Sequence, residues 1–160
     1  MTDQAFPALI ILAVLGSGAA TGSLFAFSSF VMPGLARLPA PQGIAAMQAI
    51  NITAIRPSFM LALFGSALLG IGLAGAGWWL GRQEAVWLLA AALLYLAGPV
   101  LVTVIGNVPL NDRLAAAQPS SEDGAALWQL YLRRWVQWNH LRSLLGFAAM
   151  ACWMLALAAA

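Results

Sequence analysis

Aromatic, amide and guanidinium side chains recur at helical spacing in the last third of the chain. Intervals of three, four, four and three residues separate Trp128, Tyr131, Trp135, Asn139 and Arg142, so one face of a single helix carries all five. Together they offer aromatic walls, a directional amide and a fixed positive charge. Such a set is suited to binding carbonyl or phenol oxygens on a flat, otherwise apolar molecule.

The same residue types also form belts where helices cross a membrane surface, with arginine side chains reaching towards the headgroups. We favour such a belt for Trp128 and Trp138. For Asn139 and Arg142 we favour a buried site, because polar groups within membrane helices usually face the interior of the bundle.

Amides from three other parts of the chain add to this pattern. Asn107 lies four residues after Thr103 and four before Asn111, and Asn51 comes from an earlier segment. Each amide can donate and accept hydrogen bonds without the desolvation cost of a buried charge. A helix cap would explain one of these asparagines. Several of them converging with Asn139 at one place would indicate a shared site.

His140 is the only histidine and Cys152 the only cysteine. A metal site with two histidines, or a disulfide, is therefore excluded within one chain. A haem held by His140 and a methionine stays open, although no motif supports it. His140 is either a general base or an interfacial residue. Cys152 is predicted to be a packing residue, since nothing near it in the sequence favours a thiolate.

The elements that position these groups are apolar helices. The chain has 160 residues, of which 62% are hydrophobic and 8% charged, with a mean hydropathy of +0.88. This excludes a soluble domain, because too few charges are available for a polar exterior. About 20 apolar residues cross a bilayer core as a helix. The sequence predicts an all-α polytopic membrane protein, a single antiparallel four-transmembrane-helix bundle over residues 1–160, with spans at about 6–32, 57–80, 85–106 and 141–159 and a short interfacial helix at about 43–56.

Several details of these helices are predicted as well. Pro99 should kink the third span or open its hydrogen-bond ladder. Ser120 or Ser121 can cap a helix that nothing stops before Ala159, so its first part must project from the membrane or bend along the surface. In the first span, one stripe is expected to face the bundle interior: Thr21, Phe25, Ser28 and Met32.

Antiparallel threading places the connection after the first span, the connection after the third span and the polar residues beside them at one membrane face. All the basic residues are arginines, and all except Arg82 belong to that face. The positive-inside tendency then predicts a cytoplasmic polar face and extracytoplasmic termini, in a cell inner or plasma membrane. Residues 1–4 contain no basic segment and the apolar run after them is too long for a signal peptide, so the first span is expected to remain in the mature protein.

The expected partners are membrane lipid and an apolar aromatic small molecule. The net charge of +2 is spread over the loops, so nucleic acid is not an expected partner. Gly18 and Gly22 have the small-xxx-small spacing that lets helices approach closely, either within one chain or in a homo-oligomer.

The pattern resembles the anthrone oxygenase-like family of small integral membrane proteins. The Asn-x-Pro-x-Asn segment at 107–111 and the Trp and Asn-x-x-Arg segment at 135–142 are its most specific parts. The resemblance covers nearly the whole chain and also rests on Gly22, Phe25, Ser28, residues 32–35, Met47, Gln48, Asn51, Thr103, Trp128 and Tyr131.

Fungal relatives are associated with oxidising anthrones to anthraquinones by molecular oxygen, with no established organic cofactor. The resemblance therefore implies an oxygenase acting on a flat polycyclic phenol or anthrone-type substrate. It implies Arg142, Asn107 and Asn139 as oxygen-binding catalytic groups and His140 or a water as the base, although His140 is not part of the family pattern. The implied substrate-binding residues are Ser28, Gln48, Asn51, Thr103, Asn111, Tyr131 and Trp135.

The alternative is a non-catalytic four-helix membrane protein that binds a lipid, a quinone, a haem or a partner subunit. In that case the amides would be structural and would hold the short helix against the bundle.

Overall fold

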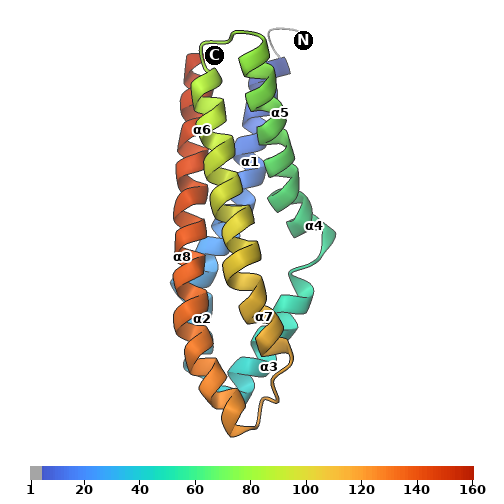
Figure 1. Ribbon diagram of the computed structural model, residues 1–160, viewed down its shortest axis with the longest axis vertical. Coiled ribbons are helices and arrows are strands. Elements are labelled where there is room, and N and C mark those ends of the chain that lie inside the picture. Colours follow the sequence, from blue (N-terminus) through green and yellow to red (C-terminus); the bar gives the residue numbers. More distant parts are fainter. Residues whose placement is uncertain (1–4) are drawn as a thin grey trace.

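The computed structural model describes residues 5–160, which form helices joined by short connections (Figure 1). Four helical stretches are long and apolar enough to cross a membrane, which confirms the predicted all-α, four-span fold. Three of the stretches contain a π-helical segment, named η here. In chain order the elements are α1 (Ala5–Ala26), η1 (Phe27–Val31), α2 (Met32–Leu35), α3 (Ala40–Thr53), α4 (Pro57–Met60), η2 (Leu61–Gly65), α5 (Ser66–Trp79), α6 (Ala85–Tyr95), η3 (Leu96–Asn107), α7 (Val108–Ala115) and α8 (Glu122–Ala159).

The four stretches run antiparallel. In Figure 1, α1 begins and α8 ends at the top, beside the turn between α5 and α6, and the other two connections lie at the bottom. Gly81 has a φ of 63° in the upper turn, a backbone conformation that favours glycine. Two predictions depend on residues 1–4, namely the side of the membrane on which the N-terminus lies and the retention of the first span. Residues 1–4 lie outside the described residues.

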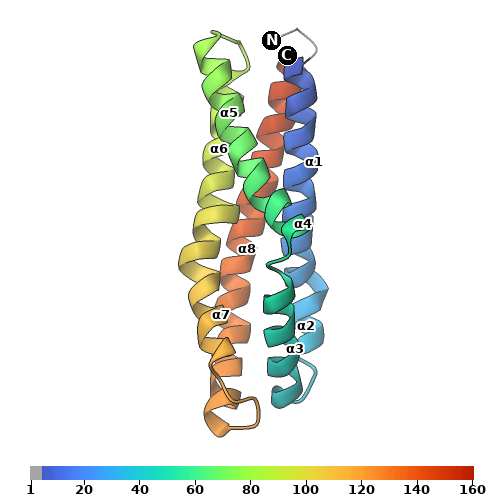
Figure 2. The same cartoon turned by 90° about the vertical axis from the view of Figure 1, so that its right-hand side faces the viewer.

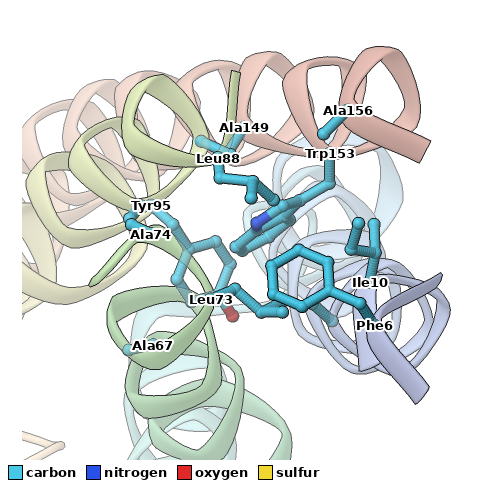
Figure 3. Close-up of a cluster of buried hydrophobic side chains, with 13 residues drawn as sticks. Phe6, Ile10, Ala67, Leu73, Ala74, Leu88, Tyr95, Ala149, Trp153 and Ala156 are labelled. Atoms are coloured by element: carbon cyan, nitrogen blue, oxygen red, sulfur yellow. The ribbon is translucent and has the colours of Figure 1, made fainter. Parts of the chain in front are cut away.

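The interior contains two hydrophobic cores, one above the other. Figure 3 shows the upper core, where Tyr95 and Trp153 pack with their ring centroids 5.4 Å apart and Phe6 lies nearby. Gly70 makes room for this arrangement, since a Cβ there would lie 2.8 Å from Cζ2 of Trp153. The lower core consists of Met32, Ile44, Met47, Leu110, Leu114, Trp128, Tyr131 and Trp135.

The short helix α3 closes the lower end of the bundle. It stands beside α2 and packs against α7 and α8, so it takes the place that α4 and α5 occupy in the upper half (Figure 2). Arg56 is extended, and Pro57 begins α4 at a position where its missing N–H is tolerated. The short helix predicted at about 43–56 therefore begins earlier and ends at Thr53.

The final helix is continuous from Glu122 to Ala159, as expected, and Ser121 caps it by accepting a 2.9 Å hydrogen bond from the Gly124 amide. Its first half projects beside α7 and α3. Trp128 is only 1% exposed and lies over Gly43, so the prediction of a membrane-surface belt at this residue was wrong. Trp138 is 36% exposed, which is consistent with the belt.

Two predictions for the other spans had different outcomes. The hydrogen-bond ladder of the third span does open around Pro99, because η3 is π-helical from Leu96 to Asn107 and the Thr103 hydroxyl donates a 2.6 Å hydrogen bond to the Pro99 carbonyl. Thr21, Ser28 and Met32 face the interior as expected, but Phe25 is 52% exposed. Its predicted inward orientation was wrong because the interior stripe passes through Leu24, which is buried, at this level.

Candidate functional site

Arg142 lies at the centre of a buried polar cluster. Its side chain donates 2.8 Å hydrogen bonds from Nε to Oδ1 of Asn139 and from Nη1 to Oγ1 of Thr103. The guanidinium carbon lies 5.1 Å from the centre of the Trp135 ring. Arg142 is only 7% exposed, and within residues 5–160 no carboxylate lies within salt-bridge distance of it. The positive charge is therefore surrounded only by neutral groups.

Asn139 joins two transmembrane helices and orients the arginine. Its Nδ2 donates to the Leu24 carbonyl at 2.7 Å and to the Ser28 hydroxyl at 2.6 Å, so η1 is held against α8. Its Oδ1 accepts from Arg142. With these three bonds the amide is satisfied and fully buried. Asn139 and Ser28 thus fix the position of the guanidinium.

Asn107 and Asn111 form a second layer against α8. Nδ2 of Asn107 donates to the Trp135 carbonyl at 3.1 Å, and Oδ1 of Asn111 accepts from the Tyr131 hydroxyl at 2.7 Å and from Nε1 of Trp135 at 2.8 Å. Tyr131 stacks between Trp135 and Trp128, with ring centroids 5.8 and 5.6 Å apart. The predicted aromatic and amide face of α8 is therefore an ordered stack.

Two buried polar atoms in this layer lack a hydrogen-bond partner among the described residues. They are Oδ1 of Asn107, whose residue is only 1% exposed, and Nδ2 of Asn51, which lies beside the Tyr131 hydroxyl. An unpaired buried acceptor or donor costs about 1–3 kcal/mol. A water or a polar group of a ligand would satisfy either atom.

Two of the predicted residues lie apart from this cluster. Gln48 donates from Nε2 to the carbonyls of Leu114 and Ala117, at 2.8 and 3.1 Å, and so ties α3 to the end of α7. His140 is exposed on the outer side of α8. The structure does not bring its imidazole to Arg142, and the predicted base role gains no support from its position.

Residues that the sequence associated only with helix bending also shape the site. Gly98 lets η3 approach α8 closely, since a Cβ there would lie 3.3 Å from the Arg142 carbonyl oxygen. Thr21 and Pro99 both face Gly146, and the buried hydroxyl of Thr21 has no partner among the described residues. The Gly98–Pro99 pair was the available signal, but it did not indicate which helix would approach.

The cluster lies where the apolar outer surface ends. Exposed apolar side chains surround the bundle down to Phe30, Ile55, Val108 and Leu141, and the exposed residues below them are mostly polar or small. Two hollows of about 330 and 410 Å³ lie on the lower part of the molecule, and no cluster residue lines either of them. The cluster is thus a packed polar layer at one edge of the expected hydrocarbon core.

Metal-ligating side chains do not gather within residues 5–160: no group of three or more histidine, cysteine, aspartate or glutamate side chains is close enough to hold an ion. The chemistry that the described cluster offers comes from one cation, several amides and hydroxyls, and an aromatic wall.

The fold and this cluster define a small four-helix integral membrane protein with a buried polar site at one membrane face. Residues 56–152 match the anthrone oxygenase family, and since this is more than half of the chain, the protein belongs to that family. The matched region includes Thr103, Asn107, Asn139 and Arg142 and ends before the last turns of α8. No curated protein and no solved structure matches the chain.

Proposed function

We propose that the protein is a membrane-embedded oxygenase that converts an anthrone-type substrate, a flat polycyclic phenol, into a quinone with molecular oxygen. The observation that carries the proposal is the guanidinium of Arg142, which is buried among neutral groups. Ionisable groups inside membrane helices usually mark functional sites, since burying a charge is unfavourable. An anionic oxygen of a ligand would supply the missing negative charge.

The reaction starts from the acidity of the substrate. Loss of a proton from the activated methylene of an anthrone to water gives an enolate, whose oxygen carries the negative charge. The enolate transfers one electron to dioxygen, and the carbon radical and superoxide combine into a peroxide. The peroxide loses the second methylene hydrogen as the O–O bond breaks. One anthrone and one dioxygen thus give one anthraquinone and one water.

The protein's contribution in this scheme is electrostatic. Arg142 would stabilise the enolate oxygen, because a nearby cation favours the ionised form of a weak acid. Asn139 and Thr103 hold the guanidinium through its Nε and Nη1. Trp135 supplies an aromatic wall beside it. No imidazole or carboxylate is needed at the cluster, since water in the adjacent headgroup layer takes the proton.

Entry of a ring system requires a change in packing, because Asn139 and Arg142 are buried. The element α4 contains no buried residue and leads into η2, which contacts η3, and Leu61 at the start of η2 is 73% exposed. An outward movement of α4 and η2 would open the lower part of the bundle to lipid, the phase in which an apolar substrate dissolves.

The test is turnover of a hydroxylated anthrone by the purified protein in lipid nanodiscs, followed by quinone absorbance and oxygen consumption and corrected with empty nanodiscs. Arg142→Gln should lower kcat by about 10²–10³-fold, the usual effect of losing one oxyanion-stabilising group. Arg113→Gln removes an exposed arginine at the same end and should retain activity. Equal rates for wild type and Arg142→Gln, or a wild-type rate no higher than empty nanodiscs, would overturn the proposal.

A non-catalytic binding role is the second candidate, and the closed packing of the cluster favours it. Gln48 and Asn139 bond to backbone carbonyls of neighbouring helices, as structural amides would. Mass analysis and absorption spectra of the purified protein separate the two roles. A copurified quinone or a haem band without anthrone turnover would support binding alone.

A further inference from the structure

The outward face of α8 carries a stripe that changes character along its length. Leu130, Arg134, Gln137, Leu141 and Leu144 follow at intervals of four, three, four and three residues, so they lie in one row on the helix surface. Leu141 and Leu144 are 41% and 68% exposed, and Arg134 and Gln137 are exposed as well. The row is polar at Arg134 and Gln137 and apolar at Leu141 and Leu144, with Leu130 as a further apolar residue at its lower end.

A hollow lies in the lower part of this row, beside its polar residues. It has a volume of about 330 Å³ and is lined by Leu130, Arg133, Arg134 and Gln137. The described residues place no carboxylate within 4.0 Å of either guanidinium. Two cations and an amide donor therefore face outward with their hydrogen-bonding capacity free, and an anion with several oxygens is the ligand that suits them.

The position of the hollow relative to the membrane identifies the kind of anion. From Leu141 to Ala159 the helix has roughly 19 residues, about 28 Å at 1.5 Å per residue, close to a bilayer core of about 30 Å. Trp138 is 36% exposed at the expected boundary, where tryptophan is favoured. Arg134 lies about one turn below Trp138, at the depth of lipid headgroups.

We propose that this hollow binds the phosphate of an anionic phospholipid, with Arg133, Arg134 and Gln137 around the headgroup and an acyl chain along Leu141 and Leu144. The apolar part of the row begins where the polar part ends, so one molecule with a charged head and an apolar chain matches both parts. A zwitterionic lipid carries a compensating cation and binds more weakly. The site is separate from the Arg142 cluster, which lies on the opposite, buried face of α8.

Native mass spectrometry of the detergent-solubilised protein tests the proposal with phosphatidylglycerol, phosphatidylcholine and inorganic phosphate. Each arginine near an anionic headgroup contributes about fivefold in affinity, so the double variant Arg133→Gln, Arg134→Gln should bind phosphatidylglycerol about 30-fold more weakly. The control is Arg37→Gln, Arg113→Gln, which removes the same charge from exposed positions elsewhere at this end and should bind as wild type does.

Each outcome decides the matter. Selective loss of phosphatidylglycerol binding in the first variant supports the site. Equal losses in both variants would show general charge attraction, and binding of inorganic phosphate as strong as that of the lipid would show that the apolar row contributes nothing. Either result overturns the proposal, as does equal binding of phosphatidylcholine by the wild type. Thermal unfolding of both variants should match wild type, since all four side chains are exposed.

Discussion

Replacing Arg142 by methionine should leave the protein as stable as the wild type or more stable, while it removes activity. Methionine has a similar length and is apolar, so it fills the space without a charge. A purely structural arginine would give the opposite result, because the network with Asn139 and Thr103 would be lost without relief elsewhere. The variant therefore separates a ligand-binding cation from a structural one.

The magnitude follows from the contacts. The substitution leaves Oδ1 of Asn139 without a donor, which costs about 1–3 kcal/mol, and removes a cation–π contact with Trp135 worth about 0.5–2 kcal/mol. Thr103 keeps its bond to the Pro99 carbonyl. In return, the variant no longer buries an unpaired charge, whose desolvation costs several kcal/mol per ion. The losses together come to about 1.5–5 kcal/mol, and we expect the relief of this desolvation to exceed them by about 0 to 2 kcal/mol in favour of the variant.

Thermal unfolding in detergent, followed by tryptophan fluorescence, measures this difference. At about 2–4 °C per kcal/mol, the midpoint for Arg142→Met should rise by roughly 0–8 °C. Arg142→Lys is the matched control, because it keeps the charge without the forked donor geometry and should be the least stable of the three proteins. A fall of more than about 6 °C for Arg142→Met would refute the reasoning.

Three further predictions test the packing. Gly98→Ala would force η3 away from Leu145 and should lower stability by about 1–3 kcal/mol. The control is Gly75→Ala, whose Cβ meets no atom within 4 Å and which should be neutral or stabilising. Equal effects of the two substitutions on the unfolding midpoint would contradict the close approach of η3 to α8. Trp153→Phe removes a buried N–H that has no partner among the described residues, so denaturant unfolding should show only the loss due to the smaller ring, about 1–2 kcal/mol. A loss of more than about 3 kcal/mol would mean that the N–H is satisfied. Ser121→Ala removes the cap of α8 and should lower stability by about 1 kcal/mol. Hydrogen exchange of the backbone amides in the first turn of α8 should then be faster, and unchanged exchange would count against the cap.

The gathering of the polar residues was predictable because it depends on connectivity alone. Once four spans are recognised, antiparallel threading brings Ser28, Thr103 and Asn139 to one end, whatever the packing angles are. The stripe on α8 was equally predictable, since Tyr131 and Arg142 share a face through helical periodicity, and both are buried.

What the sequence left open depends on contacts between distant segments. Trp128 suits a membrane belt by its type, and only the absence of a side chain at Gly43, on another helix, makes room for it in the interior. The position of α3 beside α7 was equally hidden, because the breaks at Pro39 and Pro57 mark where a helix starts but not the direction in which it runs. The outward orientation of His140 follows from the helical phase of α8, which becomes informative only when Asn139 is known to be buried.

The location of the polar layer at the lower edge of the apolar surface makes the protein sensitive to hydrophobic mismatch. A thin bilayer would leave Arg142 and Asn107 level with hydrated headgroups, whereas a thick one would surround them with acyl chains. Water supply to the layer, and the strength of the field around the guanidinium, would then vary with acyl-chain length. The same polypeptide would behave differently in a thin and a thick membrane with no change in any protein contact.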